Sequence, residues 1–143
     1  MRVTIYGIDK SEANLEEALS LKIIDKKATF NDLEKADLVI VSIPVDATEK
    51  ILPTILDRVS DNTLVIDSGS TKLSICKSVE KHSKRRNFLA THPIAGTEFS
   101  GPKAAIEGLF KDKTNIICEV EKTAFKLQER ALTIFKIMGM NMR

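Results

Sequence analysis

The chain has 143 residues, of which 43% are hydrophobic and 29% charged, with a formal net charge of +2. This length fits one domain with a single core, and this composition is typical of a globular protein and excludes a disordered one. The charge argues neither for nor against nucleic acid, but with only 5% aromatic residues we expect no nucleic-acid partner. No apolar run is long enough to span a bilayer, so we expect no membrane partner either.

Short β-rich runs alternate with amphipathic segments along the chain. Strands are expected at residues 2–7, 38–43, 63–66, 87–90 and 115–118, with a further strand beginning at 140–142. Helices are expected after an N-cap at Ser11, from Asp46 to Val59, from Ser70 or Thr71 to Val79, at residues 103–107, and from Glu121 to Met138. Asp46 is expected to cap its helix, and Pro53 to kink or restart it.

This alternation predicts an α/β fold with a doubly wound parallel sheet, which is Rossmann-like. However, the sequence contains no G-x-G-x-x-G loop, which in such a fold joins the first strand to the first helix and holds a pyrophosphate. An acidic residue at the end of the second strand binds the adenine ribose. Asp9 follows a β-rich run and precedes a helix, so it is a candidate for that residue. An ordinary loop aspartate or a helix cap is the alternative.

Two neighbouring strands end in polar, glycine-containing loops. One loop is Asp67-Ser68-Gly69-Ser70-Thr71-Lys72, and the other begins at Thr91-His92-Pro93 and continues to Gly101. Ligands of open α/β sheets bind at the carboxyl ends of the strands. Because imidazole accepts a proton near neutral pH, a histidine at this position suits proton transfer. A turn with a solvated histidine is less consistent with two such loops on neighbouring strands.

These loops carry a family resemblance. Ser-Gly-Ser-Thr-Lys, followed some twenty residues later by His-Pro-Ile-Ala-Gly-Thr-Glu-x-Ser-Gly-Pro, resembles prephenate dehydrogenases over nearly the whole chain. That family implies NAD-dependent oxidative decarboxylation of prephenate to 4-hydroxyphenylpyruvate, in tyrosine biosynthesis in the cytoplasm. The resemblance implies that His92 is the catalytic histidine, which accepts the proton of the substrate hydroxyl. It also implies that Ser70 orients the histidine and touches nicotinamide and substrate, although a serine here also suits a helix N-cap.

The resemblance assigns further contacts. Thr97 and Glu98 match residues that line the family's substrate entrance. With the resemblance, the ribose role of Asp9 is favoured, and a carboxylate there selects NAD over NADP by repelling a 2′-phosphate. The remaining cofactor contacts are expected at two loops, from Pro44, Val45, Ser68 and Gly69.

Other polar and sulfur-containing residues have no such assignment. Lys72 is expected either to contact an anion or to be solvated, and His82, in a charged helix end, to be solvated. Cys76 and Cys118 have neither a disulfide framework nor a metal-ligand spacing. We expect both to be small buried hydrophobes and expect no metal site.

The resemblance also implies a domain plan. We expect residues 1–143 to be a partial dinucleotide-binding domain without its first β-α unit and without the helical domain that supplies dimerisation and substrate contacts. Such a fragment is expected to be inactive alone, and the full-length protein to be a homodimer. Two alternatives stay open: an arogenate or other hydroxy-acid-type dehydrogenase, and a non-catalytic remnant that binds a partner. Without the first strand, we expect the strands at 2–7 and 38–43 either to pair directly or to leave an edge that associates with another chain.

Overall fold

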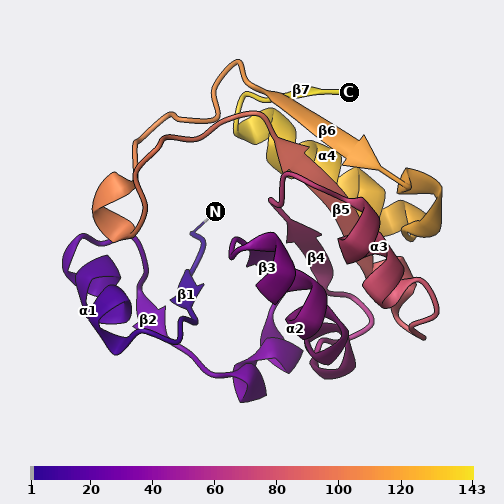
Figure 1. The fold of residues 1–143 in the computed structure, drawn as a ribbon, viewed down its shortest axis with the longest axis horizontal. Helices are drawn as coiled ribbons and strands as arrows, with labels where there is room; N and C mark the ends of the chain where they lie inside the picture. The colour runs from indigo at the N-terminus through magenta and orange to yellow at the C-terminus, as the bar shows by residue number, and fades with distance from the viewer. Residues whose placement is uncertain (1) are drawn as a thin grey trace.

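The computed structural model describes residues 2–143 as an α/β structure with two sheets (Figure 1). The strands are β1 Tyr6–Gly7, β2 Lys26–Lys27, β3 Leu38–Val41, β4 Leu64–Asp67, β5 Phe88–Pro93, β6 Thr114–Cys118 and β7 Asn141–Met142. The α-helices are α1 Glu12–Ser20, α2 Val45–Arg58, α3 Leu73–Val79 and α4 Phe125–Ile137. Short 3-10 helices are η1 Phe30–Lys35, η2 Arg85–Asn87, η3 Pro102–Ala104 and η4 Val120–Lys122.

The larger sheet has the strand order β3-β4-β5-β6-β7. The pairs β3–β4, β4–β5 and β6–β7 are parallel, whereas β5 and β6 are antiparallel, with His92 opposite Ile116. The predicted parallel sheet is therefore confirmed at three of its four strand pairs and differs only at β5–β6. A parallel neighbour needs a crossover connection. The segment between β5 and β6 contains only the short η3, so the chain instead returns in the opposite direction.

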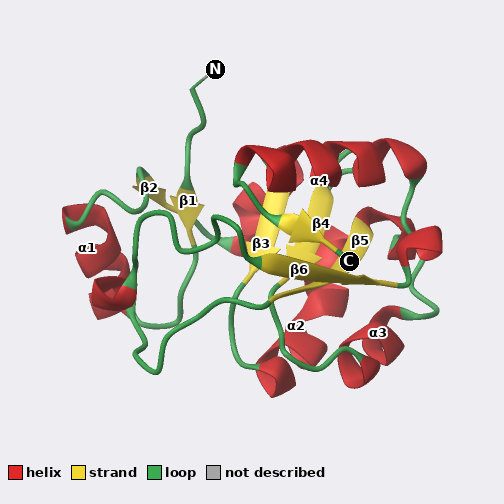
Figure 2. Ribbon diagram, turned by 90° about the horizontal axis from the view of Figure 1, so that it is seen from above, coloured by secondary structure: helices red, strands yellow, loops and turns green. Residues whose placement is uncertain are grey.

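Helices cover both faces of this sheet, which confirms the doubly wound arrangement. Figure 2 shows α4 on one face and α2 and α3 on the other. The alternation of β4 explains the two cores: Leu64 and Ile66 pack with α4, whereas Val65 packs in the cluster formed with α2 and α3. Within residues 2–143, no helix has both the length and the apolar character needed to cross a membrane.

The helix that follows β3 differs from its prediction at its N-terminus. Its N-cap is Pro44, without a side-chain cap bond, and Asp46 lies in the first turn. The capping role predicted for Asp46 is therefore wrong, although its negative charge still suits the positive end of the helix dipole. The helix also continues through Pro53 without a restart.

The smaller sheet consists of β1 and β2, which pair in parallel. β2 lies in a segment where no strand was predicted, and β1 is shorter than the predicted strand at residues 2–7. Gly7 is in close contact with the segment before β2, because an added Cβ would lie 2.7 Å from Ile24 Cδ1. In residues 2–143 β1 does not pair with β3, so the direct re-pairing considered above is not observed.

Edge association therefore remains a prediction. Ile40 lies within β3 and is nevertheless 54% exposed, and Ile43 and Tyr6 are also exposed. An open edge with apolar side chains favours pairing with another chain. We expect sedimentation velocity to show concentration-dependent self-association, which Ile40→Lys weakens because a charge on an edge strand opposes pairing. A monomer at all concentrations would contradict this expectation.

Candidate active site

The carboxyl ends of β3, β4 and β5 bring the predicted loops together. Because these strands are parallel, the segments that follow them lie at one edge of the sheet. The contact is close at Gly69, where an added Cβ would lie 2.8 Å from Ile75 Cδ1 and 3.3 Å from Val45 Cγ2. A side chain at position 69 would therefore collide with Ile75 of α3 and crowd Val45 at the start of α2. Gly69 and Val45, both predicted cofactor contacts, are neighbours in the fold.

His92 lies inside β5, opposite Ile116 of β6, rather than in a loop as expected. The β-ladder therefore fixes its backbone, and its side chain is half-buried. Ser70 is exposed, and α3 begins later, after Lys72, so Ser70 does not cap that helix. Within residues 2–143 neither side chain makes a hydrogen bond, so the predicted contact between Ser70 and His92 is not present in this structure.

One buried carboxylate connects these two segments, and sequence reasoning missed it. Asp67 has 0% exposure and forms an ion pair with Lys72, whose ammonium also donates to the Thr91 carbonyl at 2.6 Å. Lys72 is therefore neither solvated nor free to serve as a simple anion contact. The available signal was an aspartate that directly continues an apolar strand, five residues before a lysine. Its placement within a polar loop concealed its burial.

The segment between β5 and β6 crosses toward the smaller sheet. Figure 1 shows it reaching α1 through η3, and Lys103 lies 3.4 Å from Glu17 of α1. Thr97 lines a cavity of ≈ 340 Å³ in this segment, together with Phe99 and residues around η3. Glu98 is exposed. The segment thus links the part of the chain that carries Asp9 to the strand that carries His92.

Asp9 lies in the exposed turn between β1 and α1. Its Oδ1 accepts a hydrogen bond from the Ser11 amide at 2.7 Å, and the Ser11 side chain caps α1 as predicted, accepting from the Asn14 amide. Asp9 therefore helps to shape the start of the helix, as the alternative interpretation required. Its carboxylate is nevertheless exposed and held in one orientation, which is compatible with binding hydroxyl groups.

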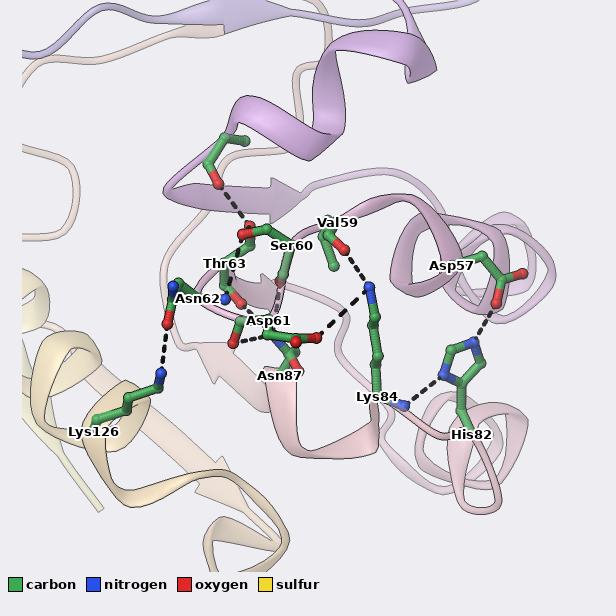
Figure 3. A network of polar contacts seen from close by, with 11 residues as sticks. Asp57, Val59, Ser60, Asp61, Asn62, Thr63, His82, Lys84, Asn87 and Lys126 are labelled. Carbon is green, nitrogen blue, oxygen red and sulfur yellow. Dashed lines mark hydrogen bonds and ion pairs between the residues drawn. The ribbon is translucent and has the colours of Figure 1, made fainter.

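The second histidine has a structural role. The prediction that His82 is solvated is wrong, since its side chain is only 14% exposed. Figure 3 shows its ring between the Asp57 carboxylate, at 2.7 Å from Nε2, and the Lys84 amide, which donates to Nδ1 at 2.9 Å. In the same network Asn87 donates to the carbonyls of the turn before β4. The density of charge around His82 in the sequence concealed this packing. His82 precedes β5 and His92 lies near its end, so the two histidines are at opposite ends of that strand.

Cys76 offers no nucleophile. Both cysteines are free; Cys76 is buried on α3 as predicted, whereas Cys118 is only partly buried. Burial raises the pKa of the Cys76 thiol to about 11, so the thiol stays protonated near neutral pH. Among the described residues, no group of three or more histidine, cysteine or acidic side chains is arranged to hold a metal ion.

Sequence comparison gives the first relatives. The family model of the prephenate dehydrogenase nucleotide-binding domain matches residues 1–142. The chain is 31% identical over 136 residues to prephenate dehydrogenase from Bacillus subtilis, covering 92% of this chain and 37% of that protein. It is 30% identical over 119 residues to cyclohexadienyl dehydrogenase from Zymomonas mobilis, covering 80% and 40% respectively. The chain therefore spans well under half the length of these relatives.

Structural comparison agrees. Prephenate dehydrogenase from Aquifex aeolicus, solved in complex with hydroxyphenyl propionate and NAD+, superposes with a TM-score of 0.89 at 27% identity, covering 100% of this chain and 51% of that chain. Arogenate dehydrogenase from Synechocystis shares the fold, with a TM-score of 0.87 at 20% identity, covering 98% of this chain and 50% of that chain. With the family model matching almost every residue, the chain belongs to the prephenate dehydrogenase family, in the region of its nucleotide-binding domain.

Proposed function

We propose that this chain is the nucleotide-binding part of an NAD-dependent prephenate dehydrogenase, with His92 as the base that accepts the substrate hydroxyl proton. The observation that carries the proposal is the position of His92 on β5, next to the strand whose loop contains Ser68, Gly69 and Ser70. Substrates of open α/β sheets bind at this end of the strands. The Bacillus subtilis relative is named for the same activity.

Two features of the chain fit NAD. The exposed Asp9 carboxylate is oriented by the Ser11 amide and suits the two hydroxyls of an adenine ribose. Gly69 is in close contact with Val45, and both follow strands at the carboxyl edge of the sheet, as Pro44 and Ser68 do. A glycine-rich pyrophosphate loop does not occur in these 143 residues. We therefore assign this chain the ribose and nicotinamide sides of the site.

The chemistry requires a proton acceptor beside a hydride acceptor. NAD, when bound, would supply the acceptor for the hydride that leaves the ring carbon bearing the hydroxyl. His92 takes the hydroxyl proton as that carbon becomes a carbonyl. When the ring carboxylate leaves as carbon dioxide, its bonding electrons aromatise the ring and the proton returns to the oxygen. A serine hydroxyl can donate and accept a hydrogen bond at once, which suits Ser70 to a relay between His92 and the substrate hydroxyl. Thr97 and Glu98 lie on the segment after His92, where we propose that substrate enters.

The complete reaction needs more than this chain. Most of the length of the relatives has no counterpart here, and we propose that the substrate carboxylates and the dimer contacts are supplied from there. The 143 residues alone would then bind NAD weakly and turn over little substrate. Arogenate, the alternative substrate that the sequence left open, is the second substrate to test.

A chimeric enzyme tests this proposal. Residues 2–143 replace the matching segment of the Bacillus subtilis prephenate dehydrogenase, and NAD and NADP binding are measured by titration calorimetry beside oxidation of prephenate and arogenate. We expect NAD binding and prephenate oxidation. In the chimera, we expect Asp9→Asn to weaken NAD binding. We also expect it to lower the ratio of the affinities for NAD and NADP, because the repulsion of a 2′-phosphate is lost. Asp46→Asn, at an exposed carboxylate in the first turn of α2, is the matched control.

The outcomes separate the alternatives. Oxidation of arogenate alone would replace prephenate as the substrate and leave the fold and cofactor assignments intact. NAD binding without oxidation of either compound would indicate another hydroxy-acid-type dehydrogenase. A folded chimera that binds no NAD would contradict the role of Asp9 and favour a non-catalytic partner-binding module.

A further inference from the structure

The buried Asp67 carboxylate makes bonds in three directions at the end of β4. Oδ1 accepts from the Thr91 amide at 3.1 Å, Oδ2 accepts from the Gly69 amide at 3.0 Å, and Oδ2 also pairs with the Lys72 ammonium. One oxygen thus holds the strand that carries His92, and the other holds the loop that carries Ser70. A carboxylate without exposure keeps such bonds free of competition from water.

Thr91 is held at all three of its polar groups. Its amide donates to Asp67 Oδ1, its carbonyl accepts from Lys72 Nζ at 2.6 Å, and its hydroxyl donates to the Asp67 carbonyl. The Thr91 carbonyl belongs to the peptide bond whose nitrogen is that of His92. Asp67 and Lys72 therefore fix the plane from which the His92 side chain projects.

The course of β5 explains why the bonds that Asp67 and Lys72 make to Thr91, which we call the clamp, are needed. The ladder between β4 and β5 ends at the pair Ile66–Leu89, and from Ala90 onward β5 pairs with β6 instead. At this point β5 leaves one neighbour for another, and ordinary ladder bonds no longer connect it to β4. The side chains of Asp67 and Lys72 make that connection.

We propose that Asp67 and Lys72 are positioning residues, which set the Ser68–Ser70 loop and the His92 peptide at a fixed separation for the reaction. This inference rests on the proposed function of the site. Neither residue exchanges a proton or touches substrate. Each acts through another group: Asp67 through the amides of Gly69 and Thr91, and Lys72 through the carbonyl of Thr91.

The first arm of the test measures catalysis in the chimera described above. We expect Lys72→Met to lower kcat about 100-fold, the effect of a displacement of about 1 Å, with KM for NAD and prephenate changed less than threefold. Lys72→Arg restores much of kcat because the cation is kept. The double variant Asp67→Asn with Lys72→Met loses less than the product of the single losses, because both variants break the same connection. Lys77→Met, at an exposed lysine of α3, is the control and leaves kcat unchanged.

The second arm uses the 143-residue chain and needs no activity. An asparagine at position 67 offers one oxygen to two amides, so Asp67→Asn should speed hydrogen exchange at Gly69 or Thr91 by about tenfold or more. Thr91→Val removes only the hydroxyl bond and serves as the milder variant if Asp67→Asn does not fold. We expect it to lower kcat by a smaller factor in the chimera.

The two arms fail in different ways. A raised KM with unchanged kcat in Lys72→Met would overturn the inference in favour of direct anion binding by Lys72. Unchanged kcat and unchanged exchange in folded variants would overturn it altogether. If the parent chimera oxidises neither compound, the proposed function fails, and unaltered exchange at Gly69 and Thr91 would then overturn the clamp separately.

Discussion

In the chimeric enzyme, His92→Asn will lower kcat for prephenate oxidation by about 10²- to 10⁴-fold, the usual contribution of a positioned general base. Asparagine has a similar shape and hydrogen-bonding capacity, but it does not accept a proton from a hydroxyl. Since His92 lies in β5 with its backbone held by β6, the substitution leaves the strand intact. NAD binding should stay within about threefold of the parent chimera, which shows that the loss is chemical.

A second histidine provides the matched control. His82→Asn removes an imidazole at the opposite end of β5, where its partners are Asp57 and Lys84, so kcat should change less than twofold. Equal kcat for the parent and His92→Asn would remove His92 from the mechanism.

The sequence predicted the positions of the site segments because they follow strands that are apolar and β-branched. Leu38–Val41 and Leu64–Asp67 could hardly be assigned to anything else, and the residues after them had to lie at one edge of a sheet. Strand direction was less accessible. The composition of Thr114–Cys118 suits a parallel and an antiparallel strand equally. Its antiparallel direction follows from the way the chain turns back after β5, which the composition does not encode.

Burial of charge was the feature least visible in the sequence. From the sequence, Asp67 and Lys72 were assigned to a polar loop, and His82 to a charged helix end. All three are covered because residues distant in sequence supply their partners, as with Asp57 for His82 and Thr91 for Lys72. Local composition does not encode such contacts. β2 was missed for a related reason, since Lys26–Lys27 is polar and becomes a strand by pairing with β1.

The largest expected effect on stability comes from Phe88, at the start of β5. Its side chain has 0% exposure and packs among residues of α2 and α3, and the Arg85 guanidinium lies 5.2 Å from its ring centre. Phe88→Ala should therefore lower the free energy of unfolding by about 3–5 kcal/mol, the usual cost of removing a buried aromatic side chain and leaving a cavity. Small domains are stable by only about 5–15 kcal/mol, so this variant should be close to unfolding in water.

The backbone at this position makes the effect specific to the side chain. The Phe88 carbonyl accepts from Arg85 at 2.7 Å and from the Thr123 hydroxyl at 2.6 Å, and alanine keeps both bonds. Urea unfolding followed by circular dichroism measures the loss, and Phe125→Ala, at a phenylalanine that is 70% exposed on α4, should stay within about 0.5 kcal/mol of the parent. Similar losses for both variants would mean that the core does not lie where β5 meets α2 and α3. A large loss for Phe88→Ala alone would mean that the same packing supports the strand that carries His92.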